Sequence, residues 1–405
     1  MYRLLLVLTL LVGPAPVTST PAADALSWVI DASHRVPVSD AELHEHLSAP
    51  LVTVFNQAIA QLGPLSAGEV LDSRPTHLQQ VVSSYVATVD VDPTGLITGL
   101  RFTPYLPAPT SWGQVDTQLH ALAPQVSFTA ARIDPRGNCH VTHALNGDIS
   151  RPLGSAFKLY VLSALAQAVA QGRLAWDQTV PLHEAWKSLP SGVLQNQPAG
   201  TPYTLRQYAD AMISISDNTA ADHLIHIVGR NSIERIAPPP NGPFLTTREL
   251  FVLKGFQYPT LVNAYLYLPQ GLRQYVLPAL DAVPRDQITP WTQPRQIDRV
   301  EWFASPDDLC HVYAGLSTEA KTQTQVGEAL SINDGGIGLN RTEFPTVWFK
   351  GGSEPGVLAL TYLARHAGGT TVMTSVLLAN PAVPLNEGSV TAQAIAIARG
   401  ALEMA

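Results

Sequence analysis

The stretch GSAFKLYVLSALAQ, residues 154–167, decides how this sequence is interpreted. It contains Ser155 and Lys158, and side chains three positions apart on a helix lie on adjacent turns of one face. The apolar residues that follow predict a buried helix. The serine and the lysine are therefore either a nucleophile with its base or two polar residues at the start of a core helix, and the rest of the sequence has to decide.

The chemistry that this pair could perform follows from its surroundings. A serine hydroxyl is a weak nucleophile unless a neighbouring base takes its proton, and Lys158 can reach Ser155 from the next turn. The apolar neighbours Phe157, Leu159 and Leu162 disfavour the ammonium form, so we expect a neutral lysine able to act as base. The start of a helix also presents backbone N–H groups to a developing oxyanion.

Two further motifs follow in the chain. Ser216-Asp217-Asn218 lies in the stretch ISISDNTAADHLI, and Lys350-Gly351-Gly352 lies in an expected strand that a turn follows. Three motifs in this order match the S-x-x-K, S-D-N and K-T-G set of the serine β-lactamases and penicillin-binding proteins. One such motif is weak evidence, whereas three in order are strong.

At this point the chain resembles a class A β-lactamase of the serine β-lactamase and penicillin-binding protein superfamily. The resemblance covers most of Gly113 to Ala405 and extends to the segments 164–182, 200–225 and 305–316. The preceding part resembles the leader domain of two-domain relatives, notably the cephalosporin esterase-like proteins associated with clavulanic acid gene clusters.

The resemblance implies catalytic roles for four residues. Ser155 is expected to be the acylated nucleophile, with Lys158 as its base. Ser216 would relay a proton to the leaving group, and Lys350 would lower the local cost of negative charge there.

The resemblance also implies substrate-binding roles. Asn218 would hold the substrate amide or Lys158, and the oxyanion hole would combine the N–H groups of Ser155 and Ser353. Gly352 lies beside Ser353 in the same motif and is expected in the binding site. Asp217 is expected to fix its loop through hydrogen bonds to the backbone.

Two features depart from the family's pattern. Gly351 stands where the family has Thr or Ser, so a hydroxyl that would hydrogen-bond a substrate carboxylate is missing. The E-x-x-L-N context of the glutamate that orients the deacylating water in class A enzymes does not occur between Asn218 and Lys350. Glu249, in a helix capped by Thr246 or its neighbour, is the candidate water-activating base, in a segment that is either a lid or a packed helical insertion.

The pattern of elements predicts an α+β fold with two domains. Residues 26–107 are expected to form a small α+β unit with a capping box at 39–42 and a hairpin turning at 92–95. The proline-rich stretch Pro104–Trp112 marks the boundary. Residues 108–405 are expected to form a class A β-lactamase-like domain, an antiparallel sheet assembled from chain-distant strands with a helical subdomain inserted, which ends in a helix capped by Ser389.

The first 25 residues are typical of a secretory signal peptide. They carry one arginine, an apolar run from Leu4 to Val12 and small residues at 23–25, so we exclude 1–25 from the fold and predict a secreted protein with no membrane span in its mature form. Export would permit a disulfide between Cys139 and Cys310. We nevertheless favour two small buried cysteines, because a large domain does not need the cross-link.

The composition of the chain limits the classes of partner that it can bind. The net charge of −8 over 405 residues offers no basic field for a nucleic-acid backbone. The histidine pairs of the sequence lack a third metal ligand, so we expect neither a metal nor a cofactor.

We predict a monomeric serine hydrolase that forms an acyl-serine intermediate with small-molecule β-lactams or related esters and amides. The alternatives are a D-alanyl-D-alanine carboxypeptidase or esterase, with a peptidoglycan peptide as substrate, and a penicillin-binding or sensing protein without turnover.

Overall fold

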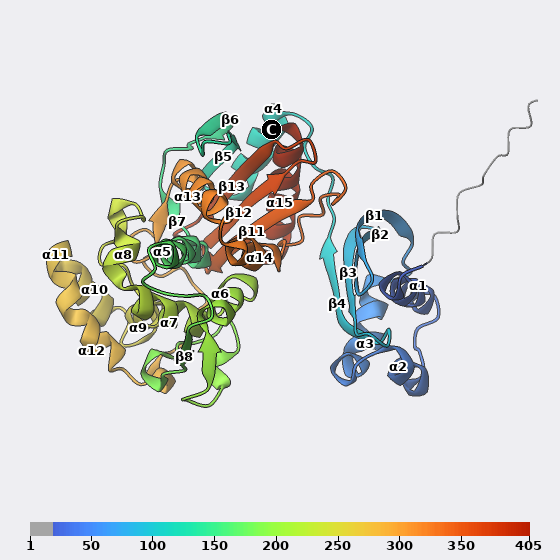
Figure 1. The fold of residues 1–405 in the computed structure, drawn as a ribbon, viewed down its shortest axis with the longest axis horizontal. Helices are drawn as coiled ribbons and strands as arrows, with labels where there is room; N and C mark the ends of the chain where they lie inside the picture. The colour runs from blue at the N-terminus through green and yellow to red at the C-terminus, as the bar shows by residue number, and fades with distance from the viewer. Residues whose placement is uncertain (1–18) are drawn as a thin grey trace, which may run out of the picture. The chain divides into compact units, whose positions relative to one another are not determined.

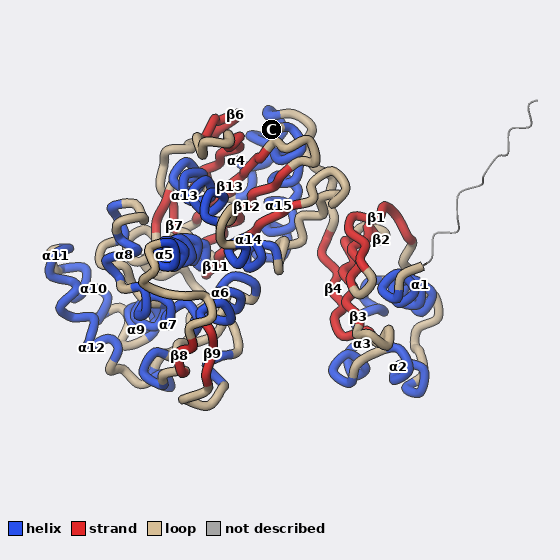
Figure 2. Tube along the Cα trace, viewed as in Figure 1, coloured by secondary structure: helices blue, strands red, loops and turns tan. Residues whose placement is uncertain are grey.

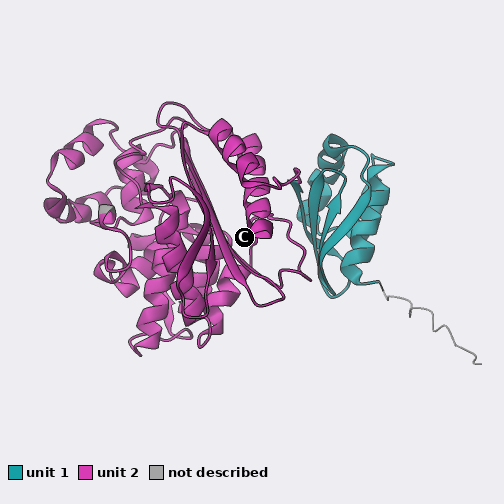
Figure 3. Ribbon diagram, turned by 90° about the horizontal axis from the view of Figure 1, so that it is seen from above, with its two compact units in different colours: residues 1–104 teal, residues 105–405 magenta. Residues whose placement is uncertain are grey.

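The computed structural model describes residues 19–405 and divides them into two compact units (Figures 1 and 3). The first unit ends at Pro104 and the second runs from Tyr105 to Ala405. The division falls at the start of the proline-rich stretch.

The first unit is a four-stranded antiparallel sheet, in the order β1-β2-β3-β4, with three helices packed on it. Its core joins Leu26 and Phe55 of the helices to Val89 of the sheet. The expected hairpin at 92–95 connects β3 to β4, and Pro50 lies in the first turn of α3, just after α2 has ended. The elements are α1 Pro21–Ser33, α2 Asp40–His46, α3 Ala49–Leu62, β1 Ala67–Arg74, β2 His77–Val82, β3 Tyr85–Val91 and β4 Ile97–Pro104.

The start of the first unit corrects the expected boundary at residue 25. Of the expected signal peptide, residues 1–18 lie outside the described part of the chain. The residues that follow begin α1, where the Thr20 side chain accepts a hydrogen bond from the Ala23 N–H and Pro21 takes the first helical position. Ala22 and Ala25 are buried in the core. The folded unit therefore begins before residue 26, because a capping threonine followed by proline starts a helix there.

The second unit is organised around a five-stranded antiparallel sheet in the order β11-β12-β13-β5-β6, which confirms the expected assembly from chain-distant strands (Figure 1). The long strands are β5 Gln125–Ile133, β6 Cys139–Leu145, β11 Thr346–Glu354, β12 Val357–Arg365 and β13 Thr371–Ala379. Shorter strands are β7 Arg151–Pro152, β8 Thr179–Pro181, β9 Pro202–Thr204 and β10 Phe303–Ala304.

Helices cover both faces of this sheet. Alternation along the strands sends one set of side chains, including Leu360 and Val376, to a core shared with α4 Trp112–Leu122 and α15 Glu387–Met404. The other set, including Leu363 and Leu377, joins a larger core with the helical part of the unit. That part gathers beside the sheet (Figure 2) and contains α5 Lys158–Ala170, α6 Leu205–Ser214, α7 Asn218–Val228, α8 Arg230–Glu234, α9 Thr247–Gly255, α10 Thr260–Tyr267, α11 Gln270–Arg273, α12 Leu277–Asp281, α13 Pro306–Glu319 and α14 Thr324–Ser331.

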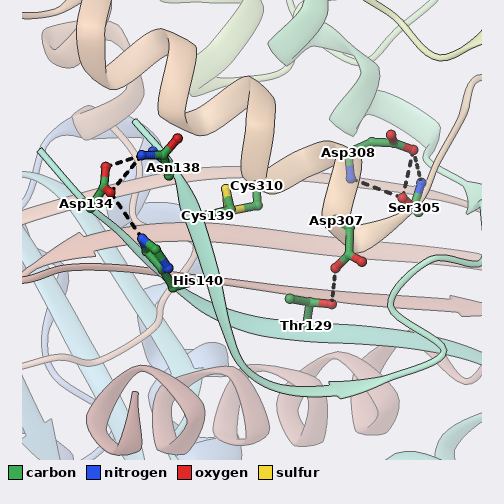
Figure 4. The surroundings of a disulfide bond; sticks show 9 residues. All are labelled: Thr129, Asp134, Asn138, Cys139, His140, Ser305, Asp307, Asp308 and Cys310. Carbon is green, nitrogen blue, oxygen red and sulfur yellow. Dashed lines mark hydrogen bonds and ion pairs between the residues drawn. A yellow bond between two sulfur atoms is a disulfide. The ribbon is translucent and has the colours of Figure 1, made fainter. Parts of the chain in front are cut away.

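Two sequence-based expectations for this unit are wrong in detail. Helix α15 is capped by Asn386, whose side chain accepts a hydrogen bond from the Ser389 N–H, so the helix starts before the expected serine cap. The cysteines are paired: Cys139 at the start of β6 and Cys310 in α13 form a disulfide with a Cα–Cα distance of 6.3 Å (Figure 4). The reason is tertiary, because α13 packs against β5 and β6 and brings together residues 171 positions apart.

Within the described residues, none of the helices combines the length and the apolar character that a membrane span requires.

Candidate active site

Ser155 lies in a single 3-10 turn, Gly154–Phe157, that runs directly into α5. Lys158 is the first residue of α5, so the two side chains are one turn apart, as the sequence predicts. The sequence KLYVLSALAQAVA is apolar on nearly all sides, and the helix is accordingly buried on nearly all sides. The nucleophile candidate therefore stands at the accessible end of an otherwise buried helix.

Two glycines allow strand β11 to pass directly over this turn. A Cβ atom on Gly352 would lie 2.4 Å from the Ser155 backbone nitrogen, and one on Gly154 would lie 2.8 Å from the Ser353 backbone nitrogen. Gly154 also has a φ of +46°, which a residue with a side chain rarely adopts. The structure thus brings Gly352 and Ser353 against Ser155, as expected for residues of one site.

The second motif lies between α6 and α7. Ser216 has a φ of +56°, unusual for a non-glycine residue and a sign of a backbone held by its surroundings. Asp217 holds it: its carboxylate accepts hydrogen bonds from the N–H groups of Ala220 at 2.8 Å, Val193 at 2.6 Å and Leu194 at 2.9 Å. This confirms the expected structural role of Asp217.

Lys158 is the centre of the polar cluster. Its Nζ lies 3.1 Å from Ser155 Oγ, 3.0 Å from Ser216 Oγ, 2.6 Å from the Ser216 carbonyl oxygen and 2.7 Å from Asn218 Oδ1. The carbonyl and amide oxygens can only accept, so they take both hydrogens of a neutral amine and leave its single lone pair to accept a hydrogen bond from one hydroxyl at a time. Burial, and secondly the charge of Lys350, lower the Lys158 pKa well below its ordinary value. The geometry and the electrostatics both suit a base.

Lys350 approaches the same hydroxyl from β11. Its Nζ lies 3.1 Å from Ser216 Oγ and 2.6 Å from the Gly351 carbonyl oxygen. Burial lowers the pKa of Lys350 to about 7. Ser216 therefore bridges two lysines, and its hydroxyl can pass a proton between Lys158 and a group bound beside Lys350.

A cleft of about 850 Å³ opens over Ser155 and includes Ser216, Asn218 and Lys350 in its lining. Much of its wall is apolar, with Leu189, Ile213, Phe251, Trp291, Trp302 and Phe349 among the lining residues. A cleft of this kind, with a few convergent polar groups, is typical of a small-molecule site.

Comparison with known proteins agrees with this geometry. Residues 125–238, which contain the first two motifs, match the sequence profile of the beta-lactamase enzyme family. The match spans less than half of the chain, and it supports a relationship of this region to the serine β-lactamase and penicillin-binding protein superfamily.

Solved β-lactamase structures share the fold. A β-lactamase from Sphaerobacter thermophilus is 22% identical over 73% of this chain and 97% of its own, with a TM-score of 0.50. A variant of the class A β-lactamase of the last common ancestor of Gram-negative bacteria is 15% identical over 72% of this chain and 97% of its own, also with a TM-score of 0.50. Comparison with curated protein sequences gives no match.

Glu249 does not belong to the cleft of this β-lactamase-like unit, which corrects its expected role. Its buried carboxylate accepts hydrogen bonds from Arg230 at 2.8 and 3.1 Å and from the Thr246 N–H at 2.6 Å. The residue is the third of α9 and completes a capping box with Thr246. Its carboxylate therefore stabilises the helix start and an ion pair, and it is not placed to activate water at Ser155.

The segment around Glu249 has features of both structures expected for it, a wall of the site and a packed helical insertion. Helix α9 contributes Leu250 and Phe251 to the cleft, as a substrate wall would. Farther along, Tyr265 is buried in the core, whereas Tyr267 and Tyr275 are 91% and 73% exposed. Most of this segment is thus a packed helical insertion, and only its first helix reaches the site.

Sequence reasoning missed a buried charged cluster next to the 3-10 turn Gly154–Phe157, which we call the nucleophile turn. Glu301 Oε2 accepts hydrogen bonds from the N–H groups of Gly154 at 3.1 Å and Trp302 at 2.9 Å. Lys254 Nζ lies 3.5 Å from Glu301 and also forms an ion pair with Glu354, the residue after Ser353. Burial raises the pKa of Glu301. This Glu301–Lys254–Glu354 cluster connects the backbone at Gly154, before Ser155, to the end of strand β11 at Glu354.

The sequence carries one weak signal for this cluster, since Glu301 stands between Val300 and Trp302 in an apolar context where an unpaired charge would be costly. Across residues 19–405, no group of three or more His, Cys, Asp and Glu side chains is arranged to hold a metal ion.

Proposed function

We propose that this chain is a serine hydrolase that acts through an acyl-serine intermediate on β-lactams or related esters and amides. The observation that carries the proposal is the position of Lys158, a buried lysine whose Nζ contacts Ser155 Oγ, Ser216 Oγ and Asn218 Oδ1 at once. An amine held in this way can take a proton from one hydroxyl and return it through the other.

The reaction follows from these contacts. Ser155 Oγ attacks the substrate carbonyl carbon while Lys158 Nζ takes its proton. The negative charge that develops on the carbonyl oxygen is stabilised by the N–H groups of Ser155 and Ser353. Ser216 then gives its proton to the leaving nitrogen or oxygen and regains one from Lys158, so that the substrate bond breaks and an ester on Ser155 remains. Water cleaves that ester by the same steps in reverse.

The placement of Glu249 favours a second candidate function. In class A β-lactamases, a glutamate orients the water that releases the acyl group, and the only residue that the sequence offered for this role is committed to Arg230 outside the cleft. A β-lactam adduct on Ser155 would then be released slowly, as in a penicillin-binding or sensing protein, while reactive esters would still turn over.

Two further expectations remain part of the proposal. Export is supported by the arginine and the apolar run from Leu4 to Val12, which are typical of a leader, and a monomer is the form in which we expect the enzyme to act. Recovery of the protein from the culture medium, followed by determination of its first residues, tests the export.

The function is tested by following product and intact mass together. The protein is incubated with a chromogenic cephalosporin, with an aryl acetate and with a D-alanyl-D-alanine peptide, each with Ser155→Ala as control. A transient adduct with steady product indicates a hydrolase, and free D-alanine indicates a carboxypeptidase. A persistent adduct with a burst of product indicates the second candidate. Product formation by Ser155→Ala at the wild-type rate would exclude both.

A further inference from the structure

The cleft does not end at Ser155 but continues across the edge strand β11. Phe349, Gly351 and Ser353 alternate along β11 with Lys350 and Gly352, so they point to the opposite face of the sheet. Gly351 pairs with Leu360 and Ser353 with Leu358, and directly opposed residues share a face. All of these residues line the cleft, as does Thr391 of α15. The cleft thus extends onto the face of the sheet that α15 covers.

The Phe349 ring occupies the space where a side chain at residue 351 would begin, and the Ala359 carbonyl oxygen lies 3.4 Å from that point. A Cβ atom on Gly351 would lie 2.7 Å from Cζ of the Phe349 ring. The ring is itself confined, because a Cβ atom on Gly335 would also meet it at 2.7 Å and Tyr362 packs against it with a centroid distance of 4.8 Å. We call the surface formed by Phe349, Gly351, Leu358 and Leu360 the apolar extension.

The charges around the cleft do not suit an anionic substrate. Among the described residues that line it, Lys350 is the one basic side chain, and Glu301 and Glu354 are acidic, with the pKa of Glu301 raised to about 8 by burial. The ammonium of Lys254 lies behind these carboxylates and is completely buried. A carboxylate on a substrate near Gly351 would lose hydration against Phe349, Leu358 and Leu360, and it would lack the hydroxyl that a Thr or Ser at residue 351 would supply.

We propose that the site selects uncharged esters or amides that carry an apolar group on the leaving-group side, and that this group binds in the apolar extension. The leaving-group side is assigned because Ser216, the residue that can protonate the leaving atom, contacts Lys350, and Gly351 follows Lys350 in β11. The inference rests on the proposed function and adds the substrate class to it.

A pair of substrates of similar shape tests this selection. The purified protein hydrolyses 4-isopropylphenyl acetate and 4-carboxyphenyl acetate, and each kcat/KM is divided by the rate constant for hydroxide-catalysed hydrolysis of the same ester. We expect the isopropyl compound to be preferred by about tenfold or more after this correction. Equal values, or preference for the carboxylate, would overturn the inference while leaving the acyl-serine reaction in place. Absence of a Ser155 adduct with either ester would instead remove the proposed function, and the inference with it.

Two variants test whether the apolar extension causes the preference. Phe349→Ala with Gly351→Thr makes room for a hydroxyl at residue 351 and adds it, so the preference for the isopropyl ester should fall by about tenfold. Phe349→Ala alone is the matched control, because it enlarges the space without adding a hydroxyl. Leu358 and Leu360 remain, so this variant should lower the preference by less than the double variant does. Circular dichroism establishes that both variants are folded. An unchanged preference in the folded double variant would overturn the assignment, and if that variant does not fold, the substrate pair decides alone.

Discussion

The Nζ atom of Lys158 lies 3.1 Å from Oγ of Ser155, and the lysine side chain is completely withdrawn from solvent. Burial removes water from the ammonium ion and so destabilises it. The lysine is therefore a neutral amine that can accept the serine proton. The partners of Lys158 on its other sides, the Ser216 carbonyl and Asn218 Oδ1, hold the amine in position without protonating it.

Replacement of the base tests this relationship. Lys158→Met keeps the length and apolar stem of the side chain but removes the amine, so we expect the rate of Ser155 acylation to fall by about 10²–10⁴-fold. Thermal unfolding serves as the control, because loss of a buried amine should not unfold the protein. An acylation rate within a few-fold of wild type would show that another group takes the proton.

The two lysines predict a bell-shaped pH dependence of acylation. Lys158 acts when neutral, so the rate rises as pH increases through its lowered pKa. Lys350 acts as a cation, and because burial lowers its pKa to about 7, the rate falls as pH rises above that value. Lys350→Arg keeps a charge at all accessible pH values and should move the falling limb to higher pH, as measured by kcat/KM. A falling limb at the same pH in this variant would mean that a group other than Lys350 causes it.

The Glu301–Lys254–Glu354 cluster predicts a positioning role for Glu301. Glu301→Leu leaves the buried Gly154 N–H without an acceptor, a loss of about 1–3 kcal/mol that should appear as a decrease of about 10- to 100-fold in kcat with little change in KM. Glu301→Gln retains an oxygen that can accept from Gly154, so it should restore most of kcat. If Gln and Leu lower kcat equally, the carboxylate acts through its charge and not as an acceptor for the nucleophile turn.

The disulfide is expected to stabilise the fold and to have no effect on activity. Cys139→Ala with Cys310→Ala opens a loop of 171 residues, and we expect a loss of about 2–4 kcal/mol in the free energy of unfolding. Neither cysteine lines the cleft, so kcat/KM should be unchanged. Reductant should lower the melting temperature of the wild type to that of the variant and leave the variant as it is. A variant that melts at the wild-type temperature under oxidising conditions would contradict the stabilising role.

The local part of the site could be predicted because its signals are local. A serine and a lysine three residues apart on an apolar helix must share a face, and the hairpin at 92–95 of the first unit carries the turn residues that fix it. The order of the three motifs then led to the resemblance that the fold bears out. The structural role of Asp217 followed from the tendency of aspartate side chains to hydrogen-bond nearby backbone groups.

The remaining features depend on contacts between distant parts of the chain. The Cys139–Cys310 pairing needs α13 to lie against β6, and the cluster of Glu301 with Lys254 and Glu354 needs three segments to meet below Ser155. Glu249 was misassigned for the opposite reason, since its neighbourhood in sequence fits a base whereas Arg230 and Thr246 occupy its carboxylate. Local pattern identifies the residue types, and only the fold decides which of them meet.

Peptide mass spectrometry shows whether Ser155 carries the acyl group. The protein is mixed with benzylpenicillin and with an aryl acetate, quenched within seconds, digested and analysed by mass spectrometry of its peptides. We expect the mass of the acyl group on the peptide that contains Ser155, and no adduct in Ser155→Ala. An adduct on another residue, or one that persists in Ser155→Ala, would contradict it.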